Sequence, residues 1–234
     1  MSVEISAALR AKLSQYDTPT VCNAIEVIAP ERRGNGFTTE QLVCARPEQG
    51  TMVGIARTAM IRATRPTDLS ADEMKERRLA YYNYIAATDE PTITVIQDLD
   101  PNPGFGAFWG EVNSNIHMGL GCVGCVTNGS FRDLDELADG FQILGSKIGP
   151  SHAYVHLVDF NIQVNVFGMT VSDGDLIHAD QHGAVAIPSA IAGDLPGAIE
   201  LVIKREAPIL AACRAPGFDI DQLRQAMADA AEIH

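Results

Sequence analysis

The sequence is poor in positive charge, in lysine and in long apolar runs. Its 234 residues carry 17 Lys and Arg against 30 Asp and Glu, which gives a net charge of −13. Nucleic acid is therefore not expected as a partner, because binding to phosphates favours a basic surface. No apolar segment approaches the about 18 residues that a membrane-spanning helix needs, so no membrane association is expected.

The start of the chain and its cysteines also exclude several classes of protein. The N-terminus lacks the basic start and apolar core of a signal peptide, so we expect a cytoplasmic location. Five scattered cysteines do not suggest a disulfide framework. Cys122 and Cys125 have zinc or redox spacing, but a zinc site needs two more soft ligands and no second such pair exists. Their small apolar neighbours favour a buried strand.

Only four lysines are present, which argues against a Schiff-base enzyme. Three of them lie in amphipathic helical stretches beside charged residues, and Lys147 follows a predicted loop. A catalytic lysine needs a desolvated pocket that lowers its pKa.

The pattern of apolar and capping residues predicts helices around a β-rich middle, which indicates an α/β layered domain. Thr18 and Pro19 are predicted to be the N-cap and first turn of a helix, and Ser70 and Glu73 form a capping-box signature. Helices are predicted over residues 5–16, 18–28, 70–87, 111–118, 133–138, 196–212 and 219–232. Strands are predicted over residues 51–63, 92–97, 123–127, 141–144, 155–166, 169–171, 176–178 and 184–187.

Gly110 lies where a predicted loop becomes a helix. The first backbone N–H groups of a helix have no internal partner, and the helix dipole adds positive character there. The stretch Gly110, Glu111, Val112 and Asn113 therefore predicts a site for a carboxylate, which glycine allows to approach the backbone closely. Any helix start shares these properties, so the motif alone is not specific.

The same region also suggests dinucleotide binding as an alternative. Gly104, Gly106 and Gly110 follow the predicted strand 92–97, but the third glycine is one position late for the G-x-G-x-x-G fingerprint. No acidic residue stands in the context expected for a ribose-binding acid.

Arg132 and Asp133 follow a strand and an Asn-Gly turn. The planar guanidinium of arginine suits a carboxylate or enolate, and aspartate is a hard oxygen ligand for Mg²⁺ or Mn²⁺. The pair together with the Gly110 helix start would suffice to hold a small 2-oxo acid beside a divalent metal ion.

Three stretches that include these residues resemble the RraA-like family, which includes class II 4-hydroxy-4-methyl-2-oxoglutarate (HMG) and 4-carboxy-4-hydroxy-2-oxoadipate aldolases. The similarity extends over roughly residues 15–210. The stretches are residues 107–112 (AFWGEV), 121–133 (GCVGCVTNGSFRD) and 174–188 (GDLIHADQHGAVAIP).

The resemblance implies roles for individual residues. Backbone amides of Gly110, Glu111, Val112 and Asn113 would hold the carboxylate of a pyruvate unit. Arg132 would contact the substrate oxygen and stabilise the enolate, and Asp133 would anchor Mg²⁺ or Mn²⁺ with water in the other positions. Glu111 matches an acid near the water shell of the metal. Glu206 is the candidate for a second acid, supplied by a neighbouring subunit.

The resemblance also implies a fold and an assembly. The fold would be an α/β/β/α sandwich of the swivelling-domain type. A single domain over residues 1–234 is expected, with N-terminal helices (about 5–28) and C-terminal helices (about 196–232) packing on it. The family forms homotrimers or hexamers with the site between subunits.

The function implied is that of a divalent-metal-dependent lyase for a small 2-oxo acid. It would cleave a 4-hydroxy-2-oxo acid such as HMG by retro-aldol chemistry, decarboxylate oxaloacetate, or do both through a pyruvate enolate. The alternative is a non-catalytic RraA-type regulator that binds and inhibits a ribonuclease. Relatives are often labelled demethylmenaquinone methyltransferases, but no S-adenosylmethionine signature is evident.

Several positions depart from the family pattern or stay open. Asn128 and Asn23 stand where relatives carry Asp, and residues 151–160 differ from the aldolases, which leaves the substrate open. His152 or His156 lining the pocket is one alternative. For His178, beside Asp175 and Asp180, a local hydrogen bond is expected.

Overall fold

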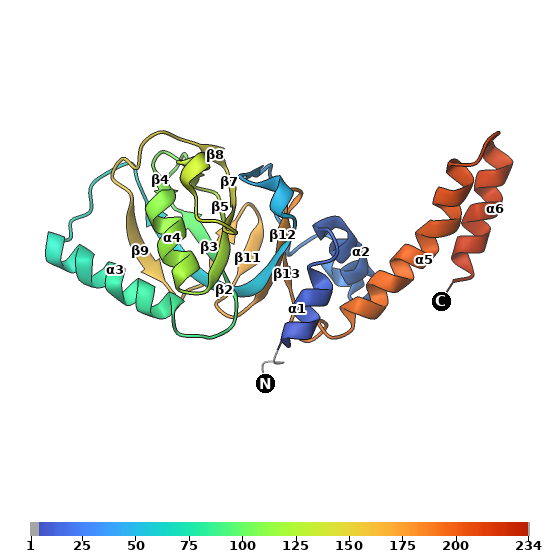
Figure 1. The fold of residues 1–234 in the computed structure, drawn as a ribbon, viewed down its shortest axis with the longest axis horizontal. Coiled ribbons are helices and arrows are strands. Elements are labelled where there is room, and N and C mark those ends of the chain that lie inside the picture. The colour runs from blue at the N-terminus through green and yellow to red at the C-terminus, as the bar shows by residue number, and fades with distance from the viewer. Residues whose placement is uncertain (1–4, 234) are drawn as a thin grey trace.

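The computed structural model describes residues 5–233, which form a mixed α/β body with a helical arm at its C-terminal end (Figure 1). The strands of the main sheet are β1 (Val43–Cys44), β2 (Met52–Arg62), β3 (Thr92–Asp98), β5 (Cys122–Thr127), β7 (Gln142–Gly145), β9 (His156–Phe160), β12 (Leu176–Asp180) and β13 (Gly183–Ile187). Their order is β1-β7-β5-β3-β2-β12-β13, with β9 also paired to β2. Strands β2, β3, β5 and β7 are parallel, and the remaining pairs are antiparallel.

The central strand β3 is buried on both faces. Ile93 and Val95 pack toward a hairpin of β10 (Val164–Val166) and β11 (Met169–Val171), while Ile96 packs on the opposite face. Alternate residues of a strand point to opposite faces, so burial of both faces requires the nearly continuous apolar run seen in the sequence.

The helices begin where local capping residues place them. They are α1 (Ala7–Leu13), α2 (Thr18–Ile28), α3 (Ala71–Ile85), α4 (Glu111–Gly119), α5 (Leu195–Cys213) and α6 (Ile220–Ala231), with 3₁₀ turns η1 (Pro30–Arg32), η2 (Pro47–Gln49) and η3 (Leu134–Glu136). The capping box of Ser70 and Glu73 is confirmed at α3. The predicted N-cap at Thr18 is wrong: Asp17 caps α2, and the Thr18 hydroxyl instead lies 3.1 Å from His178 Nδ1.

A second, smaller sheet positions the candidate site. It consists of the parallel strands β4 (Ala107–Trp109), β6 (Ser130–Phe131) and β8 (Lys147–Ile148). None of these short strands was expected from the sequence, and the predicted helix over 133–138 is only the 3₁₀ turn η3.

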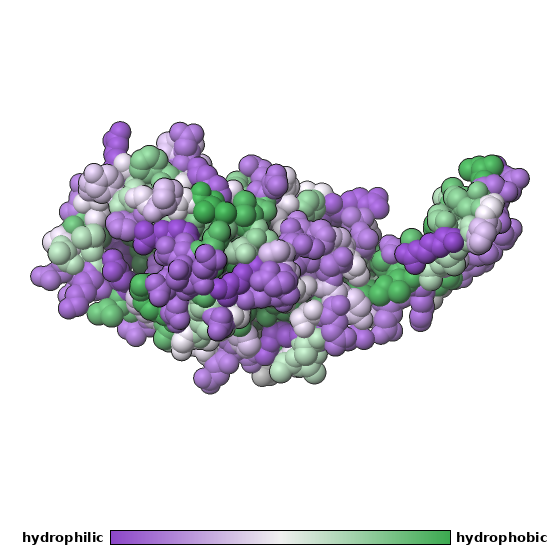
Figure 2. All heavy atoms as spheres, turned by 45° about the horizontal axis from the view of Figure 1, so that its top comes forward, coloured by the Kyte–Doolittle hydropathy of each residue, from purple (hydrophilic) through white to green (hydrophobic). Residues whose placement is uncertain are grey.

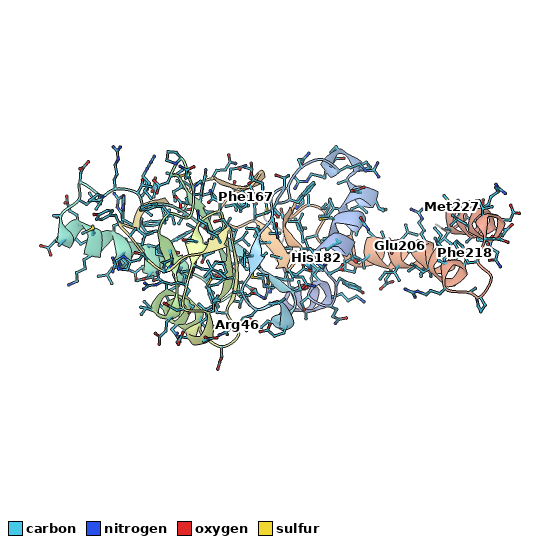
Figure 3. The ribbon with its side chains drawn as sticks, turned by 90° about the horizontal axis from the view of Figure 1, so that it is seen from above. Arg46, Phe167, His182, Glu206, Phe218 and Met227 are labelled. Atoms are coloured by element: carbon cyan, nitrogen blue, oxygen red, sulfur yellow. The ribbon has the colours of Figure 1, made fainter. Side chains whose placement is uncertain are left out.

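The arm is formed by the second half of α5 and by α6. The buried residues of α5 all lie in its first half, from Leu195 to Val202, and α6 buries Ala226 and Ala230. Figures 1 and 3 show the remaining part projecting away from the sheet, and Figure 2 shows hydrophobic residues on its surface. The exposed large apolar side chains of the arm are Ile203, Leu210, Phe218, Ile220 and Met227.

The α/β architecture expected from the sequence is confirmed. The extent of a single domain over residues 1–234 stays a prediction, and its residues 1–4 and 234 lie outside the described part. Within residues 5–233, no helix is both long and apolar enough to cross a membrane.

Candidate functional site

The candidate site lies where β4 and β6 end side by side. Both strands are parallel, and the Arg132 N–H donates to the Trp109 carbonyl at 3.0 Å, which ties their carboxyl ends together. Gly110 and α4 follow β4, while Arg132 and Asp133 follow β6. Gly110 and Arg132, about 20 residues apart in sequence, therefore lie close together at the carboxyl ends of these strands. Ligand sites of α/β proteins commonly form at this position.

Asp133 turns its carboxylate toward the start of α4. Its backbone adopts the left-handed conformation (φ 54°), which aspartate tolerates better than most residues. Its Oδ2 accepts a hydrogen bond from the Glu111 N–H at 3.2 Å and lies 3.4 Å from Arg132 Nε. No hydrogen bond from residues 5–233 reaches Oδ1, and 35% of the side chain is exposed. One carboxylate oxygen therefore remains available to an external partner.

Gly110 is the N-cap of α4 and provides the space that this arrangement needs. It has no capping side chain, and its extended backbone is open to any residue. A Cβ at this position would lie within 3.0 Å of Asp133 Oδ2. The requirement for glycine is therefore one of space around the carboxylate rather than of backbone conformation.

The anion site predicted at the helix start is partly occupied by the protein itself. The Glu111 N–H is used by Asp133, which leaves the N–H groups of Val112 and Asn113 in the uncapped first turn. The Asn113 side chain is also committed, because it donates to the Phe108 carbonyl and accepts from the Tyr82 hydroxyl at 3.0 Å. Only the backbone of Asn113 remains for a ligand.

Buried hydrogen bonds fix the first turn of α4. His117 Nδ1 lies 2.7 Å from the Asn113 carbonyl and its Nε2 lies 2.9 Å from the Tyr81 hydroxyl. Burial lowers the pKa of His117 to about 4, so the ring is neutral at pH 7 and Nδ1–H donates while Nε2 accepts. Side chains that are fixed by burial and hydrogen bonds, as His117 is, hold the neighbouring site residues in one geometry.

A cavity of about 690 Å³ opens over these residues. Its lining includes Gly110, Glu111, Arg132 and Asp133, together with residues of α3 and residues 152–157. The volume is in the range of small-molecule sites. Both His152 and His156 line this cavity, as one sequence alternative proposed.

The carboxylates of the cavity suit a hydrated hard cation. Within residues 5–233 no group of three or more His, Cys, Asp or Glu could hold a metal ion. Mg²⁺ commonly keeps several waters and uses only one or two protein carboxylates together with the substrate. Asp133, with its free Oδ1, and Glu111 beside it therefore fit Mg²⁺ or Mn²⁺ better than zinc, which prefers a closed set of nitrogen and sulfur ligands.

Other sequence candidates lie elsewhere in the structure. Glu206 is on the arm, remote from α4, and does not line the cavity of its own chain (Figure 3). The local hydrogen bond expected for His178 is wrong: the buried ring contacts Thr18 and the Leu13 carbonyl, 160 and 165 residues away in sequence, and it is His182 that contacts Asp180. Cys122 and Cys125 are buried in β5, and burial raises the pKa of both thiols.

The basic residues of α3 were not identified from the sequence. Arg77, Arg78 and Tyr82 line the same cavity as Asp133. One signal was available: residues 57–78 hold six of the 17 Lys and Arg in a strongly acidic chain. That clustering does not reveal which cavity the residues line, because the helix–sheet packing decides it.

Fold and site together define an α/β protein whose small-molecule cavity is lined in part by a helix start, an arginine and an aspartate. The family model described as RraA-like (Aldolase/RraA) matches residues 18–186. The chain belongs to this RraA-like family, as the sequence motifs indicated. No curated protein matches the chain.

Several solved structures are similar to this one. An uncharacterized protein from Pseudomonas syringae is 20% identical, with 96% of each chain covered and a TM-score of 0.72. Streptomyces coelicolor RraAS2, described as an unusual member of the RNase ES inhibitor RraA protein family, is 18% identical (90% and 98% covered, TM-score 0.67). The RNA-processing inhibitor RraA from Thermus thermophilis is 15% identical (70% and 90% covered, TM-score 0.51). At these identities the likeness establishes the fold alone.

Proposed function

We propose that this protein is a divalent-metal-dependent carbon–carbon lyase for a small 2-oxo acid. It would cleave a 4-hydroxy-2-oxo acid such as HMG, decarboxylate oxaloacetate, or do both. The observation that carries the proposal is the grouping of Arg132 and a half-exposed Asp133 carboxylate around the uncapped start of α4 within one cavity.

Each group of the site has a chemical task in this proposal. The free N–H groups of Val112 and Asn113 bind the substrate carboxylate at the positive end of the helix dipole. The Arg132 guanidinium donates to the 2-oxo oxygen and stabilises the negative charge that develops there as the carbon–carbon bond breaks. Mg²⁺ or Mn²⁺ held by Asp133 would supply Lewis-acid polarisation of the same group.

Retro-aldol cleavage also needs a base for the proton of the 4-hydroxyl group. Glu111 is exposed and lines the cavity next to Asp133, so it is the candidate within the chain. Glu206 is a candidate only in a homotrimer or hexamer, in which the arm of a neighbouring copy would bring it to this cavity. Decarboxylation of oxaloacetate needs no such base, so the two reactions separate the contribution of these acids.

The test is pyruvate release from oxaloacetate and from HMG, with Mg²⁺ or Mn²⁺ and then with EDTA. We expect metal-dependent release that falls by about 100-fold or more in Arg132→Ala, because the charge developing in the transition state loses its donor. Asp133→Ala should remove the metal dependence together with the activity. Arg214→Ala, which removes an exposed arginine beside the end of α5, serves as the matched control. Activity near wild type in Arg132→Ala would refute the mechanism.

A non-catalytic regulator is the second candidate, favoured by the inhibitor names of the similar Streptomyces and Thermus proteins. A regulator that acts through its outer surface does not depend on a carboxylate inside a cavity. Inhibition of a ribonuclease that is equal for the wild type and Asp133→Ala, with no pyruvate release from either substrate, would favour this candidate over the lyase.

A further inference from the structure

The segment of residues 151–156 brings two histidines to the cavity that the proposed chemistry has not yet used. Both His152 and His156 line the same cavity as Asp133. Within residues 5–233 neither of them forms an ion pair with a carboxylate, whereas His182 does. Histidine is the side chain that ordinarily titrates closest to neutral pH, so a histidine that lines a ligand cavity is a candidate for acid–base chemistry.

The backbone of this segment is tied to the strand that leads to the candidate site. The Ala107 N–H donates to the Ser151 carbonyl at 2.9 Å. A Cβ at Gly106 would lie 2.5 Å from the His152 carbonyl, so this close approach of the two backbones requires glycine. Ala107 is the first residue of β4, and Gly110 follows three residues later. At the rise of a β-strand, His152 is therefore anchored about 10 Å from Gly110.

Further hydrogen bonds hold the segment on the other side of His152. Ala153 adopts the left-handed conformation (φ 46°), and its N–H donates to the Ser151 hydroxyl oxygen at 3.0 Å. The Tyr154 N–H donates to the Ala63 carbonyl at 3.2 Å, at the end of β2. A residue other than glycine keeps such a backbone conformation only where the surrounding structure imposes it. The position of the His152 backbone is therefore fixed from both sides.

The His152 ring is held in the tautomer that a base needs. Its Nδ1 lies 2.8 Å from the Ala153 carbonyl. A carbonyl oxygen can only accept, so in the neutral ring Nδ1 carries the hydrogen and Nε2 carries the lone pair. His152 is exposed, and among residues 5–233 no hydrogen bond reaches Nε2. A neutral imidazole with a free Nε2 is the form that takes a proton from a substrate.

The proposed reaction needs a base at some distance from the groups that bind the 2-oxo acid head. The 4-hydroxyl lies two carbons beyond the 2-oxo carbon, so its base must lie beyond the residues that hold the head group. Glu111 adjoins Asp133, because its N–H donates to Asp133 Oδ2 at 3.2 Å. His152 lines the same cavity but is anchored at the other end of β4. Its place in the fold therefore suits the 4-hydroxyl better.

We infer that His152 is the general base of the retro-aldol reaction, an inference that rests on the proposed function for the position of the head group. Nε2 takes the proton of the 4-hydroxyl, and the O–H electron pair forms the C=O bond of the leaving carbonyl compound. The C3–C4 bond breaks, and its electron pair forms the pyruvate enolate, whose charge Arg132 stabilises. The proton on Nε2 then passes to C3. The products are pyruvate and a ketone or aldehyde, and no further reactant is consumed.

Comparison of the two proposed reactions in one protein isolates the base, because oxaloacetate has no 4-hydroxyl proton to remove. Both rates are measured with Mg²⁺ present, for the wild type and for His152→Gln. In the variant, kcat for HMG cleavage should fall by about 100-fold or more, the loss typical of a missing general base, while KM stays at the wild-type value. Oxaloacetate decarboxylation should stay within about twofold of the wild-type rate, since it needs no such base.

Two further measurements guard against a merely structural effect. In His152→Ala, added imidazole should restore part of the HMG cleavage, because the free base can occupy the space of the missing ring. It should leave the decarboxylation rate unchanged. His182→Gln is the matched control: His182 lies in the turn between β12 and β13, contacts Asp180 and does not line the cavity, so both rates should stay at wild-type values.

The outcomes separate this inference from the proposed function. Wild-type HMG cleavage in His152→Gln, an equal loss of both reactions, or a raised KM at unchanged kcat each overturns the role of His152 and leaves the proposed lyase intact. A selective loss of HMG cleavage in His156→Gln or Glu111→Gln, but not in His152→Gln, assigns the base to that residue instead. Absence of both reactions in the folded wild type with Mg²⁺ overturns the proposed function, and the inference with it.

Discussion

Helices α3 and α4 pack against each other but begin in opposite ways. At α3, the Ser70 hydroxyl accepts from the Glu73 N–H at 3.3 Å, and the Glu73 carboxylate accepts from the Ser70 N–H at 2.8 Å. At α4, Gly110 offers no side chain, and within residues 5–233 the side-chain acceptor at the first turn is Asp133, which follows strand β6.

The two helix starts therefore serve different ends: the start of α3 serves stability and the start of α4 serves function. A helix start closed by its own residues contributes to stability and can be recognised from four consecutive positions. A helix start closed by a distant carboxylate depends on the pairing of β4 with β6, and it leaves backbone donors for a ligand. Changes at α4 should therefore affect activity most, and changes at α3 capping residues should affect stability.

The largest effect is expected from Gly110→Ala. The added Cβ would lie within 3.0 Å of Asp133 Oδ2 and must displace the carboxylate. Because misplacement of a reacting group by about 1 Å can cost about 100-fold, pyruvate release should fall by roughly that factor. Gly119→Ala is the control on the same helix, since a Cβ there meets nothing within 4 Å. Equal activity of the two variants would contradict the role given to the α4 start.

An intermediate effect is expected from His117, which joins α4 to Tyr81 of α3. Burial lowers its pKa to about 4 from an ordinary 6.5, so as the pH falls the unfolded chain binds the proton first. The neutral His117 ring therefore contributes fully to the free energy of unfolding above about pH 6.5. As the pH falls toward 4, this contribution, on the order of 1–3 kcal/mol, is lost.

Urea unfolding at pH 7.5, 6, 5 and 4.5 measures that loss. His117→Gln, which cannot titrate in this range, should be less stable at neutral pH and should lose less stability on acidification. His152→Gln, at an exposed position, should keep the wild-type slope. A wild-type slope in His117→Gln would show that other groups control the pH dependence.

The smallest effect is expected from Ser70→Ala. Loss of the N-cap hydroxyl should lower the free energy of unfolding by about 1 kcal/mol, as for other N-cap serines. The pKa of Glu73 is lowered mainly by the hydrogen bond from the Ser70 hydroxyl, so it should rise in the variant. Thermal unfolding and a carboxyl NMR titration measure the two changes, and Ser70→Asp should restore the cap.

Much of the secondary structure followed from local pattern. The predicted strand 92–97 is β3, and the predicted helix 111–118 is α4 to within one residue. These elements have either a continuous apolar run or a clear start signal. The strands β4, β6 and β8 were missed because each has two or three residues and is defined only by its neighbours. The N-cap of α2 was misplaced by one residue because two adjacent polar residues both suit the position.

The sequence by itself determined the family and the identity of the residues at the candidate catalytic end. Gly110, Arg132 and Asp133 are recognisable because their spacing belongs to one helix–strand unit. Only the tertiary structure decided that Asp133 takes the first amide of α4 and that Arg77 faces the same cavity. Such contacts depend on strand register and on helix packing. Both result from many interactions between residues far apart in sequence, which no local pattern of residues encodes.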